Sequence, residues 1–420
     1  MSALLRLAWR SAWHRRFGLS LVVLSVALST FLLLGVERVR HEVRAGFEQS
    51  VSGTDLIVGA RTSAVQLLLY SVFRIGSATS NISWGSVQAL ERDRAVSWVV
   101  PISLGDSHRG FPVVATSPSY FQHFRYGNRQ PLALAEGRPF SEVFDAVLGA
   151  NVAQRLGYRL GQELVLSHGG GEIAGGDHAD KPFRIVGILA RTGTPVDRSV
   201  HIGLAGMEAI HLDWVAGVPL PGAGVPAARV QEHDLTPKSV TAALVGLKSR
   251  SAVFSVQRRI NESRGEALLA ILPGVALDEL WEAVGAGERA LLAMSALVAA
   301  VSLAGLVAVV VTGLEQRRRE LAVLRSIGAG PPQVFALLLL EGAGVTALGA
   351  VLGALGCALA AGLLAPWAMA QFGLGLQLDW PSAVELGLLA AVLLAGTAAS
   401  LLPGWRAYRM SLADGLSPRG

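Results

Sequence analysis

Four long apolar stretches stand out along the chain, separated by sequence that mixes polar and apolar residues as a soluble domain does. The first, 17–36, contains no charged residue. At a rise of about 1.5 Å per residue it measures about 30 Å, which is the thickness of the hydrocarbon core of a bilayer. The others cover 290–314, 332–365 and 383–403, in which only Glu341 and Glu385 are charged. The pattern therefore predicts four transmembrane helices.

A cleaved signal peptide is a second interpretation of the first stretch. The apolar core of a signal peptide spans about 7–15 residues and ends at a small-residue cleavage site. Here the apolar run is longer and passes directly into Glu37 and Arg38. We therefore interpret 17–36 as an uncleaved membrane anchor.

Arginine residues indicate which loops face the cytoplasm. They are concentrated in 1–16, 315–331 and 404–420, whereas the loop 366–382 has neither lysine nor arginine. Basic residues close to a span stay on the cytoplasmic side of the membrane. The rule predicts a multi-pass membrane protein with both termini and the 315–331 loop in the cytoplasm. Residues 37–289 then form a large domain outside.

The composition agrees with a membrane protein. Hydrophobic residues make up 51% of the chain and charged residues 16%, against about 25% charged residues in a typical soluble domain. The net charge of +5 could suggest a nucleic-acid partner, but arginines beside the spans account for it. Cys357, the single cysteine, lies within an apolar stretch, so the outer domain must fold without a disulfide.

Residues 37–289 have the pattern of an α+β domain. Short runs rich in valine, isoleucine and leucine predict strands, and helical pieces at 84–93 and 151–157 interleave with them. Apolar residues recur at helical spacing in 37–50 and 276–289, next to the first two apolar stretches. We expect these segments to form a helical stalk, with a pair of ordinary surface helices as the alternative.

The 315–331 loop predicts a short amphipathic helix, because Leu321, Leu324 and Ile327 recur at helical spacing. Glu315 precedes Arg318 by three residues, an order that favours an ion pair on a helix. From periodicity alone, this helix could either connect two spans or dock on a partner.

Several strings resemble the FtsX/MacB/LolC-like permeases of ABC transporters, the mechanotransmission (type VII) group. The loop segment 318–329 reads RRELAVLRSIGA, and the segment 401–409 after the last span reads LLPGWRAYR. LAWRS at 7–11 is similar to the amphipathic N-terminal segment of that family. In the outer domain, EGRPF at 136–140 and AVLGANVAQRLG at 146–157 resemble its MacB-like periplasmic core domain. The order of one span, a large outer domain and three further spans also matches.

The resemblance implies a permease subunit of a bacterial inner membrane that transmits ATP-driven motion to its outer domain. It implies a dimer of permeases, identical or paralogous, over two copies of a cytoplasmic ATPase, with a periplasmic adaptor or substrate-binding protein as a further partner. The 315–331 loop would be the coupling helix that contacts the ATPase. The residues assigned to this contact are Glu315, Arg317, Arg318, Arg319, Glu320, Leu321, Leu324 and Arg325.

The sequence contains no nucleotide-hydrolysing motif. Its lysines are Lys181, Lys238 and Lys248, none of them in a phosphate loop, and there is no HExxH zinc motif. We therefore expect no enzyme activity and no cofactor in this chain, with ATP and Mg²⁺ bound by the partner ATPase. Three functions stay open: efflux or lipoprotein release, regulation of a cell-wall enzyme without transport, and a membrane receptor or scaffold without an ATPase.

Histidine and aspartate residues flank a glycine-rich loop of the outer domain. His168, Asp177, His178 and Asp180 are of residue types that bind metal ions, and His201, His211 and His233 follow them. Their spacing fits no defined metal motif. A metal site and a plain polar loop are therefore both open interpretations.

Gly349 and Gly353 form a GxxxG pair in the third apolar stretch, which allows close helix packing. The sequence leaves open whether this face packs within the chain or across a dimer.

Overall fold

A computed structural model describes residues 16–50, 52–169, 177–215, 218–219, 224–316, 329–372 and 380–409. The chain divides into two compact units, which are described separately. The helical unit comprises Met1–Glu42, Gly285–Pro366 and Leu376–Gly420. The sheet unit comprises Val43–Val284 and Trp367–Gly375.

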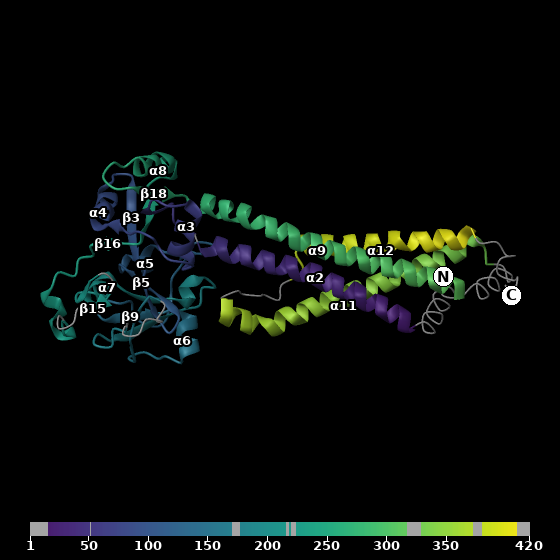
Figure 1. Cartoon of the computed structure of the whole chain (residues 1–420), viewed down its shortest axis with the longest axis horizontal. Coiled ribbons are helices and arrows are strands. Elements are labelled where there is room, and N and C mark those ends of the chain that lie inside the picture. Colours follow the sequence, from purple (N-terminus) through teal and green to yellow (C-terminus); the bar gives the residue numbers. More distant parts are fainter. Residues whose placement is uncertain are drawn as a thin grey trace. The chain divides into compact units, whose positions relative to one another are not determined.

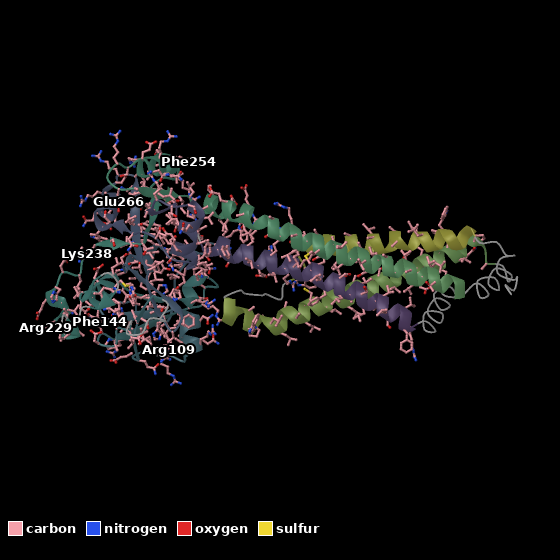
Figure 2. All side chains as sticks on the ribbon, in the orientation of Figure 1. Arg109, Phe144, Arg229, Lys238, Phe254 and Glu266 are labelled. Atoms are coloured by element: carbon pink, nitrogen blue, oxygen red, sulfur yellow. The ribbon has the colours of Figure 1, made fainter. Side chains whose placement is uncertain are left out.

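Four helices of the described residues are long and apolar enough to cross a membrane (Figure 1). They are α2 (Arg16–Ser50), α9 (Pro273–Gln316), α11 (Pro331–Phe372) and α12 (Ala383–Arg409). The mean hydropathy of their most apolar windows lies between 1.9 and 2.5. Figure 2 shows that side chains along these helices are mostly apolar, while charged side chains such as Arg229 and Lys238 stand on the surface of the sheet unit. The four predicted spans are confirmed.

Apolar side chains from all four helices form one core in the helical unit. Among its members are Val26 of α2, Leu306 of α9, Leu338 of α11 and Val392 of α12. Other leucines, such as Leu28, point outward and are exposed. An apolar exterior around an apolar core is what lipid-facing helices need, because lipid tails offer no polar partner.

The GxxxG face of α11 packs against α2 of the same chain. A Cβ placed on Gly349 would lie 2.7 Å from the Cβ of Val26, and one placed on Gly353 would lie 2.5 Å from the carbonyl oxygen of Ala27. Such distances leave no room for a side chain. Of the two possibilities that the sequence left open, the structure shows packing within the chain.

Within the described residues, the sheet unit is built on a mixed sheet of 12 strands. Its main path runs β10-β12-β9-β13-β5-β3-β17-β1-β18. Most neighbouring strands are antiparallel, whereas β12 and β9, and β13 and β5, run parallel. These strands are β1 (Leu56–Ala60), β3 (Val96–Ser103), β5 (Phe111–Thr116), β9 (Asp145–Leu148), β10 (Glu163–Leu164), β12 (Phe183–Leu189), β13 (Val200–Gly203), β17 (Ala242–Leu247) and β18 (Leu268–Ile271).

In the part of the chain that the structure describes, three strands join the sheet off this path and three small two-stranded sheets accompany it. The off-path strands are β4 (Asp106–His108), β8 (Leu134–Gly137) and β11 (Ser167–His168). The small sheets pair β2 (Ile82–Ser83) with β16 (Ser239–Val240), β6 (Arg125–Tyr126) with β7 (Gln130–Pro131), and β14 (Trp214–Val215) with β15 (Val218–Pro219).

Short helices complete the sheet unit and confirm the α+β class. The α-helices are α3 (Ala64–Leu68), α4 (Trp84–Arg92), α5 (Ser119–His123), α6 (Ala150–Leu156), α7 (Leu204–Ile210) and α8 (Val253–Asn261). The other helical turns are η1 (Leu69–Phe73), η2 (Pro195–Arg198), η3 (Ala227–Glu232) and η4 (Arg250–Ala252). Buried aliphatic side chains of the strands, such as Ile57, Val100 and Val114, pack with these helices into an apolar core.

Candidate functional site

The predicted coupling residues belong to the segment between α9 and α11. α9 ends at Gln316, so Glu315 lies in its last turn, and α11 begins at Pro331. Proline suits this position because the first residues of a helix have no partner for their N–H groups. The segment 317–328, which contains the other predicted coupling residues, lies outside the described residues. Its contact with an ATPase stays a prediction.

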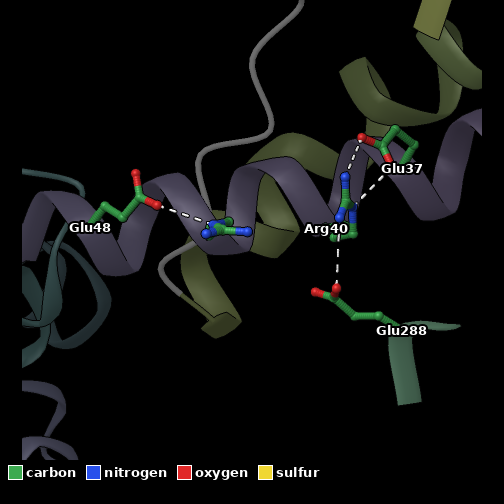
Figure 3. Close-up of polar contacts among 5 residues, drawn as sticks. Glu37, Arg40, Glu48 and Glu288 are labelled. Carbon is green, nitrogen blue, oxygen red and sulfur yellow. Dashed lines mark hydrogen bonds and ion pairs between the residues drawn. The ribbon is translucent and has the colours of Figure 1, made fainter. Parts of the chain in front are cut away.

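Acidic side chains beside the apolar part of α2 are paired with arginines (Figure 3). Glu37 is buried and accepts two hydrogen bonds from the Arg40 guanidinium, at 2.9 and 3.0 Å. The same guanidinium lies 3.7 Å from a carboxylate oxygen of Glu288 in α9. The pairing offsets the cost of burying the Glu37 charge and joins α2 to α9 within the helical unit.

Glu385 lies in the first turn of α12 and is also paired. Its carboxylate accepts a hydrogen bond from the backbone N–H of Ser382 at 2.8 Å, and the Ser382 hydroxyl accepts one from the N–H of Glu385 at 3.2 Å. This reciprocal arrangement is a capping box. A second oxygen of Glu385 lies 3.2 Å from Nε of Arg38. Glu385 therefore has a structural role at the helix start.

In the sheet unit, two strands bring an aspartate and a histidine face to face. β4 and β11 pair antiparallel, and Asp106 is the register partner of His168. Directly opposed residues on an antiparallel pair point to the same side of the sheet. The ring nitrogen Nδ1 of His168 lies 3.0 Å from Oδ1 of Asp106.

Two further histidines join this pair. His211 follows the last turn of α7, and its Nε2 lies 3.6 Å from Oδ1 of Asp106 and 3.3 Å from Nδ1 of His168. His178 lies with its ring centroid 5.0 Å from that of His211. One ligand atom from each of Asp106, His168, His178 and His211 can be chosen so that all four lie within 4.8 Å of one another. We call these four residues the His₃Asp cluster.

The surroundings of the cluster hold its members in place. The ring of Trp214 packs against those of His168 and His178, with centroid distances of 5.1 and 4.7 Å. Lys181 is buried, and its ammonium group lies 2.8 Å from Asp180 and 3.1 Å from Asp213. This buried ion pair ties the segment after His178 to the segment after His211.

Two of the histidines have shifted pKa values for identifiable reasons. Burial lowers the pKa of His178 to about 4. For His211, burial also disfavours the charged form, but the nearby carboxylate of Asp106 outweighs it, and the pKa is raised. The cluster thus combines a histidine that stays neutral at pH 7 with one that pairs with an acid.

Of the predicted metal-binding candidates, the structure brings His168 and His178 together. Asp177 instead accepts a hydrogen bond from the Ser167 hydroxyl at 2.6 Å, and Asp180 pairs with Lys181. His201 is buried in the core of the sheet unit and His233 is exposed, so of the later histidines only His211 joins the cluster.

Asp106 is the member that the sequence analysis missed. It stands 62 residues before His168 in the chain, and only the pairing of two very short strands brings them together. All three residues of β4, Asp106, Ser107 and His108, are buried, which is unusual for such polar residues. This burial is a property of the fold, so it gave no signal in the sequence.

Two protein families match the chain. Residues 292–412 match the family described as FtsX-like permease C-terminal. Residues 19–263 match the family described as MacB-like periplasmic core domain. No curated protein matches the chain in sequence.

Two solved structures are similar to part of the chain at low sequence identity. One is the periplasmic region of MacB from Actinobacillus actinomycetemcomitans, with 11% identity and a TM-score of 0.34, covering 55% of this chain and 94% of that one. The other is the extracellular domain of the noncanonic ABC-type transporter YknZ from Gram-positive bacteria, with 12% identity and a TM-score of 0.29, covering 52% of this chain and 99% of that one.

Proposed function

The chain belongs to the FtsX-like permeases that carry a MacB-like periplasmic core domain, and we propose that it transmits the motion of a separate ATPase across the membrane to that domain. The family is the permease component of ABC transporters, in which ATP hydrolysis belongs to another subunit. In this proposal the work is done on molecules outside the cytoplasmic membrane, by efflux or lipoprotein release, and no substrate passes between the four spans.

The observation that supports this proposal best is the continuity of two helices. α2 runs without a break from Arg16 to Ser50, and α9 from Pro273 to Gln316, so each is longer than the roughly 20 residues that a bilayer needs. In the helical unit they are joined by a hydrogen bond of 2.9 Å between Ser25 and Ser302. An unbroken hydrogen-bonded helix can pass a tilt or a shift from one end to the other.

The polarity of the helices supports a mechanical role over a transport pathway. Among the described residues of the four long helices, the buried acids are Glu37, Glu341 and Glu385. Glu37 and Glu385 are paired with arginines. A conduction pathway for ions or polar solutes would need polar groups along its length.

The coupling loop provides the test. We expect Leu321→Asp to abolish the ATP hydrolysis of the complex, because a charge on the apolar face of the coupling helix would prevent its seating in an apolar groove of the ATPase. The chain would be purified from membranes with its associated ATPase, identified by its phosphate-loop sequence, and hydrolysis measured after reconstitution in lipid nanodiscs. Leu324→Asp should behave in the same way.

Ala322→Asp is the matched control. At helical spacing, position 322 points away from the face that carries Leu321 and Leu324. The control should insert, bind the ATPase and support hydrolysis. Equal ATPase activity in Leu321→Asp, Ala322→Asp and the unchanged chain would remove the loop from the mechanism, and the lack of any associated ATPase would refute the proposed function itself.

A further inference from the structure

We propose that the His₃Asp cluster binds one divalent transition-metal ion, with Zn²⁺ as the ion that its ligands fit best. The first argument is geometric. Around a tetrahedral Zn²⁺ with ligand distances of about 2.0–2.1 Å, neighbouring ligand atoms are about 3.3 Å apart. The three atoms contributed by Asp106, His168 and His211 are separated by 3.0, 3.3 and 3.6 Å. One ion therefore reaches all three with small movements of the side chains.

The second argument comes from buried polar atoms that lack a partner. Oδ2 of Asp106 and Nε2 of His178 are buried and have no hydrogen-bond partner within the part of the chain that the structure describes. Asp106 is 4% exposed and His178 1% exposed. Burying such atoms without a partner is costly, and a native protein normally satisfies them. Both residues contribute a ligand atom to the set that lies within 4.8 Å, so a metal ion in the cluster would give each of these buried side chains a partner.

The third argument is the tautomer of His211. Its Nδ1 lies 2.9 Å from the backbone carbonyl oxygen of Met207, which can only accept a hydrogen bond. Nδ1 of the neutral ring therefore carries the hydrogen, and Nε2 presents its lone pair to the cluster. Metal-binding histidines are usually oriented in this way, by donating the other N–H to a carbonyl or a carboxylate.

The ligand set also indicates the class of ion. Three imidazole nitrogens with one carboxylate suit Zn²⁺ and its first-row neighbours, whereas Mg²⁺ and Ca²⁺ require oxygen ligands. The side chains of His168 and His211 are 31% and 25% exposed. An ion can therefore enter from solution and leave again, which favours an exchangeable site over a permanently enclosed one.

Metal content and affinity test the proposal directly. The full chain would be purified in detergent through a histidine-free tag, stripped with a chelator and dialysed against ZnCl₂. We expect one Zn²⁺ per chain by elemental mass spectrometry, and no displacement by Mg²⁺ or Ca²⁺. His168→Ala and His211→Ala should each weaken Zn²⁺ binding by more than roughly tenfold. Loss of a residue that only supports a ligand already weakens metal binding by about that factor, and these residues are direct ligands.

His233→Ala is the matched control, because His233 is an exposed histidine of the same unit that lies outside the cluster. It should bind Zn²⁺ as the unchanged chain does. A second readout guards against misfolding: Zn²⁺ should slow hydrogen exchange in β4, β11 and α7 of the unchanged chain and of the control, but not of His168→Ala. Substoichiometric zinc in the unchanged chain, or equal zinc in His168→Ala, would overturn the proposal.

Discussion

Replacing Gly353 by valine is expected to destabilise the helical unit by about 3 kcal/mol or more, the upper range for inserting extra methyl groups into a packed interface. The new Cβ would lie 2.5 Å from the carbonyl oxygen of Ala27 and 2.7 Å from the Cβ of Thr30. Both atoms belong to the neighbouring helix α2, and a backbone carbonyl cannot rotate away. The two helices would have to separate along their contact, which would expose the small-residue faces that now fit together.

The stability of the bundle can be measured by titrating SDS into the full chain in mild detergent and following the loss of helical structure. Gly353→Val should unfold at a clearly lower SDS fraction than the unchanged chain, with Gly353→Ala in between. Gly344→Val is the matched control, since Gly344 lies on the same helix with open space around the position of its Cβ. If Gly353→Val and Gly344→Val unfolded at the same point, close packing of α11 on α2 would be contradicted.

The sequence predicted the spans correctly because the signal for a membrane helix is local. Length and apolarity decide it, and both can be counted in the chain. The partner of the GxxxG face could not be found in this way. Gly349 and Gly353 show that something packs closely there, but the choice of α2 follows from how all four helices fill one core, and that core depends on side chains far apart in sequence.

The same distinction between local signals and contacts of distant residues explains why the sequence predicted only part of the candidate metal centre. His168 and His178 stand ten residues apart and could be suspected together, whereas Asp106 and His211 come from strand β4 and the end of helix α7. Their approach depends on strand register, which is set by the whole sheet rather than by local sequence. Asp177 and Asp180 lie in the same stretch as His178 but pair with Ser167 and Lys181. Proximity in sequence indicated the region, and the fold selected the residues.

The stability of the sheet unit is expected to fall as the pH drops below about 6.5, in part because of His201. This side chain is fully buried in β13, between Val114 of β5 and Val147 of β9. Burial lowers its pKa to about 3, and the nearby Arg74 guanidinium adds to the shift. Below pH 6.5 the unfolded chain binds a proton at this histidine that the folded chain does not bind. The contribution of His201 to the free energy of unfolding is therefore fully present above the pKa of the unfolded chain. It is lost as the pH falls from there to the pKa of the folded chain.

His201→Phe isolates this contribution. The ring stacks on Tyr120 with a centroid distance of 5.5 Å. Among the described residues its nitrogens have no well-aligned hydrogen bond, only a weak contact with the backbone of Val147, so an aromatic ring without nitrogen loses little. One proton is worth about 1.4 kcal/mol per pH unit. Between pH 8 and pH 5 the free energy of unfolding of the unchanged chain should therefore fall by about 2 kcal/mol more than that of His201→Phe. The difference arises over the roughly 1.5 pH units between the unfolded pKa and pH 5.

Urea titration of the full chain in detergent, read by pulsed hydrogen exchange in β5 and β13, reports the unfolding of the sheet unit alone. His123→Phe is the comparison, because burial lowers the pKa of His123 as well, but this side chain is only half-buried and stacks on Trp98. His123→Phe should reduce the loss of stability at low pH as His201→Phe does, but by a smaller amount. If the difference in stability between the unchanged chain and His201→Phe stayed constant from pH 8 to pH 5, His201 would not be held neutral by the core. The acid sensitivity of the sheet unit would then have to come from other groups, such as His178, whose pKa burial also lowers, or the carboxylates.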